Sequence, residues 1–268
     1  MNKYFLFLFL ISFTTIYASK VDTVVVFSTS MQKNIPNIVI KPNSYNTNKR
    51  FPVLYLLHGA YGNYTNWIKK VPEIKKYADM YQMIIVCPDG TPFSWYFDSP
   101  IIKNMRYETY IAKELVTAID NKYHTLISRK SRAITGLSMG GHGAYYIAFK
   151  HKNVFGAAGS MSGGMNLVKF SKNWKIAKQL GSYQQYPDNW KKNTVINMIH
   201  LIKNNDLKLI LDCGVNDFFY EVNKEVHQKL LKNKISHHYS EYPGDHSWRY
   251  WKNSIKYHML FFDIFFNS

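Results

Sequence analysis

The stretch RAITGLSMGGHGAYYIAFK, residues 132–150, decides the fold. It opens on an apolar run that predicts a strand and closes on small and apolar residues that predict a helix. Between the two, Gly136-Leu-Ser138-Met-Gly140 matches the pattern G-x-S-x-G, in which a serine is held in a sharp, strained turn. Side chains at the two glycines would collide with neighbouring backbone. Strand, turn and helix in this order predict that Ser138 is a nucleophile.

Further short apolar runs lie on both sides of this segment. Such runs are typical of strands in a parallel sheet that is covered on both faces. Together with the run at 131–136, they comprise residues 52–57, 83–87, 156–161 and 207–213. Nearer the N-terminus, residues 21–28 and 35–41 are rich in β-branched side chains and predict two antiparallel strands.

Segments with helical periodicity separate these runs. The clearest is 105–123, where apolar residues recur at spacings of three and four, and 221–231 and 252–266 behave similarly. Strands that alternate with helices indicate an α/β fold with a mostly parallel central sheet flanked by helices. Residues 165–205 interrupt the alternation. We expect them to form a partly helical insertion over the carboxyl edge of the sheet, where such folds bind ligands.

A serine hydroxyl needs a base to remove its proton and an acid to orient that base. In folds with this serine turn, the acid and then the histidine follow the serine along the chain. His246, one of ten histidines, lies in the loop PGDHSW between the last strand-like segment and the final helix. His58 precedes the serine, and most of the others end helices or fall within helices and strands. The sequence therefore predicts His246 as the base.

Two aspartates compete for the role of the acid. Asp212 lies inside the apolar run at 207–213, whereas Asp217 lies in the turn beyond it, from which a carboxylate can reach the far nitrogen of the histidine. We choose Asp217, which lies 79 residues after Ser138 and 29 before His246. The second gap leaves room for one helix and one strand. The competing interpretation of Asp217 is a cap for the helix that follows.

The oxyanion of an ester carbonyl also requires backbone N–H donors. Met139 follows the serine at the start of a helix, where N–H groups are unpaired and the dipole favours negative charge. The second donor is expected in the loop HGAYG, residues 58–62, and we choose Ala60. A simple glycine turn without a catalytic role explains the same loop.

The N-terminus has the features of an export signal. Lys3 supplies a positive charge, and residues 4–13 form an apolar run too short to span a bilayer. Cleavage is expected after Ala18, which makes residues 1–18 a signal peptide and 19–268 a single domain. An uncleaved anchor or a buried first helix is the competing interpretation. With cleavage, the protein is secreted or periplasmic and has no stable membrane insertion.

Composition places the chain among globular proteins, since 46% of its residues are hydrophobic and 19% charged. The formal charge is +17, carried by 29 Lys scattered along the chain and only 5 Arg. This favours a solvated basic surface over the clustered stripe of nucleic-acid binders, and attraction to acidic polysaccharide is the alternative. Cys87 and Cys213 lie on strands that are not expected to be neighbours, so we predict two buried free thiols.

These residues resemble the Putative esterase family of the α/β hydrolases, which holds esterase D (S-formylglutathione hydrolase), feruloyl and acetyl xylan esterases, and mycolyltransferases. The matching segments are PVLYLLHGAYGNYTNW (52–67), CPDGTPFSWYFDSP (87–100), 107–123, ITGLSMGGHG (134–143), DCGVND (212–217) and YPGDHSWRYW (242–251). The resemblance implies an α/β-hydrolase fold, a triad of Ser138, Asp217 and His246, and Ala60 and Met139 as oxyanion donors. Residues 165–205 match no motif of the family.

The resulting hypothesis is a serine carboxylic-ester hydrolase that acts through an acyl-enzyme on acetyl or feruloyl esters of carbohydrates, or on short-chain esters. An acyltransferase with the same triad and a non-catalytic binding module are the alternatives. No metal-ligand spacing or phosphate loop is present in the sequence, so neither a cofactor nor a nucleic-acid partner is expected. The aromatic residues that could line a site, although ordinary packing is the favoured explanation for any single one of them, are Tyr61, Trp67, Trp95, Tyr96 and Trp248.

Overall fold

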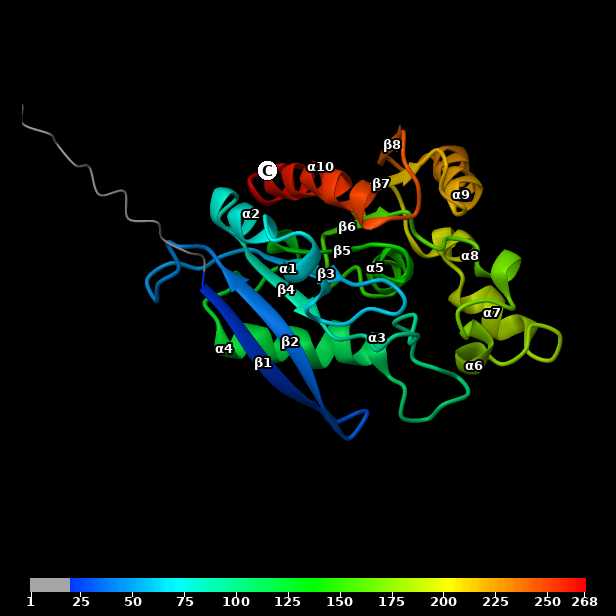
Figure 1. Cartoon of the computed structure of the whole chain (residues 1–268), viewed down its shortest axis with the longest axis horizontal. Coiled ribbons are helices and arrows are strands. Elements are labelled where there is room, and N and C mark those ends of the chain that lie inside the picture. Colours follow the sequence, from blue (N-terminus) through cyan, green and yellow to red (C-terminus); the bar gives the residue numbers. More distant parts are fainter. Residues whose placement is uncertain (1–19) are drawn as a thin grey trace, which may run out of the picture.

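Eight strands form one sheet in the computed structural model, which describes residues 20–268 (Figure 1). Their order is β1-β2-β4-β3-β5-β6-β7-β8, and all pairs from β4 to β8 are parallel. β1 pairs antiparallel with β2, and β2 with β4. The strands span Lys20–Ser28 (β1), Lys33–Lys41 (β2), Val53–Leu57 (β3), Ile84–Pro88 (β4), Arg132–Gly136 (β5), Ala157–Met161 (β6), Lys208–Gly214 (β7) and His238–Tyr242 (β8).

Helices cover both faces of this sheet, so every residue of β3, β4, β5 and β6 is buried. This explains why these strands read as continuous apolar runs. The helices that pack on the sheet include α1 (Asn66–Lys70), α2 (Ile74–Met80), α4 (Val116–Lys122), α5 (Met139–Lys150), α9 (Tyr220–Lys232) and α10 (Trp248–Phe266). α1, α2 and α10 pack with one core cluster, and α4, α5 and α9 with the other. Figure 1 shows α2 and α10 together on one side of the sheet and α4 on the other.

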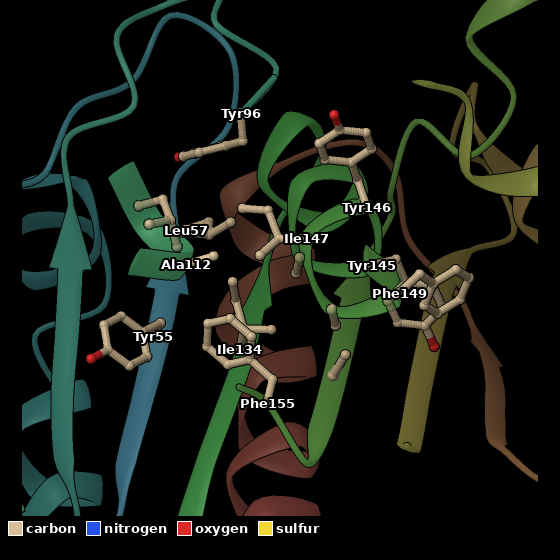
Figure 2. Packing of buried hydrophobic residues seen from close by; sticks show 14 of the residues in the cluster. Tyr55, Leu57, Tyr96, Ala112, Ile134, Tyr145, Tyr146, Ile147, Phe149 and Phe155 are labelled. Carbon is tan, nitrogen blue, oxygen red and sulfur yellow. The ribbon is translucent and has the colours of Figure 1, made fainter. Parts of the chain in front are cut away.

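The core on the α5 side is rich in aromatic side chains. Figure 2 shows Tyr55 and Ile134 on the strands together with Ala112, Ile147 and Phe155. All five side chains are buried. Close packing of this kind makes the sheet rigid, and the loops at its carboxyl edge are attached to this rigid support.

The predicted helix at 105–123 is present as a continuous helical segment with a change of pitch. It consists of α3 (Tyr107–Thr109), a π-helical turn (Tyr110–Leu115) and α4. Periodicity indicates the buried face of such a segment, but not one extra residue in a turn. The predicted pattern of alternating strands and helices is otherwise confirmed, and the fold is that of an α/β hydrolase.

The two cysteines lie on separate strands, as predicted. Cys87 belongs to β4 and Cys213 to β7, with β3, β5 and β6 between them. Both are buried and free. Burial raises the pKa of each thiol, so both stay protonated and unreactive.

The segment 165–205 forms a series of short helices between β6 and β7. Figure 1 shows α6, α7 and α8 at one end of the molecule, beyond α5. The helices are Leu167–Phe170, α6 (Ile176–Leu180), α7 (Pro187–Asn193), α8 (Val195–Met198) and Ile199–Leu201. The predicted signal peptide, residues 1–18, lies outside the described residues. Among residues 20–268, no helix is both long and apolar enough to cross a membrane.

Candidate active site

Ser138 lies in a strained turn between β5 and α5. Its backbone has φ 55° and ψ −117°, which is unfavourable for a residue with a side chain. A Cβ at Gly136 would come within 2.7 Å of the Gly140 backbone, and one at Gly140 within 2.6 Å of the His58 carbonyl oxygen. The Ser138 N–H donates to the carbonyl of Met161 at 2.9 Å, which fixes the turn to β6. The two glycines are therefore required by close backbone contacts.

The three side chains selected for the triad converge on this turn. His246 Nε2 lies 2.9 Å from Ser138 Oγ, and His246 Nδ1 lies 2.9 and 2.8 Å from the two carboxylate oxygens of Asp217. Because a carboxylate only accepts, the ring proton belongs on Nδ1, and Nε2 is left to accept the serine proton. Ser138 follows β5, Asp217 follows β7 and His246 precedes α10. Residues 108 positions apart in the chain thus form one hydrogen-bonded series.

Asp217 contacts His246 and is not the cap of α9. The cap residue is Phe219, and no side chain caps the helix. Asp217 Oδ1 accepts the backbone N–H of Phe219 at 2.8 Å, in the turn before α9, and also contacts His246. The Asp217 side chain is fully buried, whereas that of His246 is 14% exposed. A carboxylate has enough lone pairs for both bonds, so the turn holds the acid in place for the histidine. Asp212 takes no part in this series and bonds instead to α10.

The two N–H groups proposed for the oxyanion come from different segments of the chain. Met139 is the first residue of α5, where an N–H has no intrahelical acceptor. Ala60 lies in the loop after β3 and lines the same cavity as Ser138. These positions suit a carbonyl oxygen held next to the serine.

His58 holds the Ala60 loop in place. Its Nε2 accepts the Gly90 N–H at 2.8 Å, so Nδ1 carries the proton and donates to the Gly59 carbonyl at 2.8 Å. Burial lowers the pKa of His58 and keeps the ring neutral. The Tyr96 hydroxyl adds bonds to the His58 backbone at 3.1 Å. His58 therefore has a structural role, because its hydrogen bonds hold the loop in place without a ligand.

A cavity of about 460 Å³ opens above the serine. Ser138 and His246 lie in its lining, together with Tyr61 and Trp248 from the predicted aromatic set. The other three members of that set, Trp67, Trp95 and Tyr96, are at most 1% exposed and belong to the core. Aromatic type alone could not separate these two groups. No group of three His, Cys, Asp or Glu side chains suited to a metal ion occurs within residues 20–268.

One wall of the cavity is aromatic and was not predicted. Trp174 and Phe218 stack with ring centroids 5.5 Å apart, and Phe218 lies 4.1 Å from the His246 ring. Trp174 comes from the unmatched segment 165–205, and its carbonyl accepts Trp95 Nε1 at 3.2 Å. The insertion thus contributes a side chain to the cavity, as its expected position at the sheet edge suggested.

The lining also includes polar residues. Gly62 ends the Ala60 loop, and Asn66 and Lys70 belong to α1. The lining contains Lys70 but no Asp or Glu. The cavity therefore combines aromatic side chains with polar and basic ones.

The fold and this arrangement define an α/β hydrolase that acts on carboxylic esters. The chain belongs to the family described as Putative esterase, whose model matches residues 28–262. It is 26% identical over 216 residues to an acetyl esterase of Caldicellulosiruptor saccharolyticus, covering 75% of this chain and 79% of that protein. It is 33% identical over 132 residues to an esterase of Mycobacterium tuberculosis, covering 48% of this chain and 29% of the relative. A solved ferulic acid esterase superposes with a TM-score of 0.80 at 28% identity, over 93% of this chain and 99% of that one.

Proposed function

We propose that this ester hydrolase is an exported serine esterase that works through an acyl-enzyme formed on Ser138. The observation that carries the proposal is the 2.9 Å contact between Ser138 Oγ and His246 Nε2 at a cavity in an esterase-family chain. A hydroxyl in this position can lose its proton to the imidazole as it attacks. The features of an export signal in residues 1–18 support secretion.

In the first step, Ser138 Oγ attacks the ester carbonyl carbon while His246 Nε2 takes the hydroxyl proton. The tetrahedral adduct then collapses, the bond from carbon to the alcohol oxygen breaks, and His246 returns the proton to the departing alcohol. In the second step, a water attacks the acyl-enzyme with His246 as the base, which releases the carboxylic acid and restores the serine. Asp217 holds the ring and stabilises its charged form in both steps.

Charge that develops on the carbonyl oxygen is met by the N–H groups of Ala60 and Met139. Each such donor contributes about 10²- to 10³-fold to the rate, because it is oriented before the reaction begins. The rigid hydrogen bonds around His58 support that preorganisation at Ala60.

The substrates we propose are acetyl or feruloyl esters of carbohydrates, or short-chain esters. The aromatic wall of Trp174 and Phe218 suits a planar acyl group beside His246. The alcohol would lie toward Asn66 and Lys70, where a hydroxylated group finds polar partners. The names of an acetyl esterase and a ferulic acid esterase among the similar proteins agree with this choice.

A hydrolysis panel tests the proposal directly. Acetyl, butyryl and feruloyl esters are offered both free and on xylan, to the parent protein and to Ser138→Ala. We expect turnover by the parent and none by the variant, with unchanged thermal stability. Ser128→Ala is the control, because Ser128 lies before the opposite end of the same strand and should keep full activity. Retained hydrolysis by Ser138→Ala would refute the nucleophile.

A further inference from the structure

A second hydrogen-bonded cluster lies inside the protein and shares no residue with the triad. Both carboxylate oxygens of Asp212, on β7, accept hydrogen bonds from α10. The Tyr250 hydroxyl donates to Oδ1 at 2.7 Å. The Ser254 hydroxyl and His258 Nε2 donate to Oδ2, also at 2.7 Å each. We call these four residues and Thr135 the Asp212 cluster.

The cluster reaches a third element through His258. The second ring nitrogen, Nδ1, lies 2.9 Å from the hydroxyl of Thr135 on β5. Between β5 and β7 runs β6, and a Cβ at Gly159 would come within 2.6 Å of both His258 Nδ1 and Thr135 Oγ1. The glycine on the middle strand therefore provides the space in which the imidazole joins β5 to β7.

Each of the three joined elements leads to one member of the triad. Thr135 precedes Ser138 by three residues on the chain, and Asp212 precedes Asp217 by five. α10, which supplies the three donors to Asp212, begins two residues after His246. The buried carboxylate of Asp212 and the His258 ring thus connect β5, β7 and α10, the three elements next to the triad residues.

The first turn of α10 carries this connection to the imidazole. The Tyr250 ring packs against Gly244 in the His246 loop, within 2.5 Å of where a Cβ would lie. The adjacent Trp251 meets the His246 ring edge to face at 4.9 Å. Because Asp212 fixes the Tyr250 hydroxyl, it also restricts how this turn and the loop before it can move.

We propose that Asp212 is a positioning residue, which sets the distance between His246 and Ser138 by anchoring α10 to β7 and β5. The inference rests on the proposed function of the triad. A displacement of about 1 Å at a reacting group can cost roughly 10²-fold in rate, so an anchor of this kind has a measurable effect. It acts on the chemical step through the first turn of α10, which also carries Trp248 and Trp251 of the cavity lining.

The test removes one hydroxyl from the cluster by Tyr250→Phe. We expect kcat for an acetyl ester to fall about tenfold and KM to change less than kcat, because the displacement of His246 affects the chemical step more than substrate binding. Tyr123→Phe is the matched control. It also removes a hydroxyl that donates to a carboxylate, that of Asp22 at 2.8 Å, but at the β1 edge of the sheet. Its kcat should equal that of the parent.

Thermal unfolding of the two variants separates positioning from general stability. A kcat within twofold of the parent in folded Tyr250→Phe would overturn the proposal, as would an equal fall in Tyr123→Phe. If Tyr250→Phe does not fold, Ser254→Ala replaces it. The expected fall in kcat is then about threefold. An unchanged kcat in Ser254→Ala would again overturn the inference. Turnover by the parent and its loss in Ser138→Ala test the proposed function separately.

Discussion

The protein contains two hydrogen-bonded series of the same composition, Asp217–His246–Ser138 and Asp212–His258–Thr135. In the first, the carboxylate contacts Nδ1 and the hydroxyl Nε2; in the second the two nitrogens exchange partners. The His246 side chain is 14% exposed and borders a cavity, whereas that of His258 is 0% exposed. The same three kinds of group therefore border a cavity at one place and join buried elements of the fold at the other.

The hydroxyl itself also differs between the two series. Ser138 sits in a strained turn at the start of a helix, beside the N–H groups proposed for the oxyanion. Thr135 is a regular residue of a buried strand, with a β-branched side chain and no space for a substrate. Access, backbone strain and oriented N–H donors, more than the residue types, distinguish a reactive series from a structural one.

Exchanging each histidine for glutamine should separate the two series most clearly. His246→Gln is expected to lower kcat by about 10⁶-fold with little change in stability, because the base is lost from a partly open site. His258→Gln should reduce the free energy of unfolding by about 2 kcal/mol, since it disturbs a buried carboxylate, and should lower kcat only about tenfold, as expected for a member of the Asp212 cluster. Ester hydrolysis and chemical denaturation of both variants check this crossed pattern. Similar losses of activity and stability in the two variants would contradict it.

Asp217→Asn should have the next largest effect, a fall in kcat of about 10⁴-fold. The amide oxygen can still accept the Phe219 N–H, so the turn before α9 and the stability of the fold should be kept. What is lost is the charge that fixes the Nδ1–H tautomer of His246. Kinetics alongside thermal melting test this. A variant with parental kcat would show that the acid lies elsewhere.

A smaller effect on activity is expected at the aromatic wall, which borders only the Asp217–His246–Ser138 series. Trp174→Ala should lower kcat/KM for a feruloyl ester about fivefold more than for an acetyl ester, because an aromatic contact of about 1 kcal/mol is lost only with the larger acyl group. The ratio of the two specificity constants is the measured quantity. Tyr186→Ala is the control, because Tyr186 is half exposed on the same insertion, whereas Trp190 is buried. An unchanged ratio would place the acyl group elsewhere.

The sequence indicates the three members of the Asp217–His246–Ser138 series, because each of them follows a local rule. The glycines around Ser138 indicate a strained turn, and the loops of Asp217 and His246 lie at strand and helix ends where a sheet brings them together. The parallel strands are predicted by their apolar runs for the same reason: burial on both faces leaves a direct compositional mark.

The buried Asp212–His258–Thr135 series was not predicted, because its residues lie in sequence patterns that ordinary packing explains. His258 falls within a helical pattern and Asp212 within an apolar strand, and only the tertiary arrangement of α10 against β7 pairs them. Trp174 belongs to a segment without a motif, so its place in the cavity depends on how the insertion folds. The positions of Trp67 and Trp95 illustrate the same limit, since an aromatic residue near a motif can as well be core.

Fluorophosphonate labelling followed by peptide mass spectrometry tests the central claim most directly. The reagent forms a bond only with a hydroxyl whose proton a neighbouring base removes. We predict one label per molecule, on Ser138, no label on Thr135, and no labelling of Ser138→Ala or His246→Gln. Label on any other residue, or equal labelling of Ser138→Ala, would contradict the account.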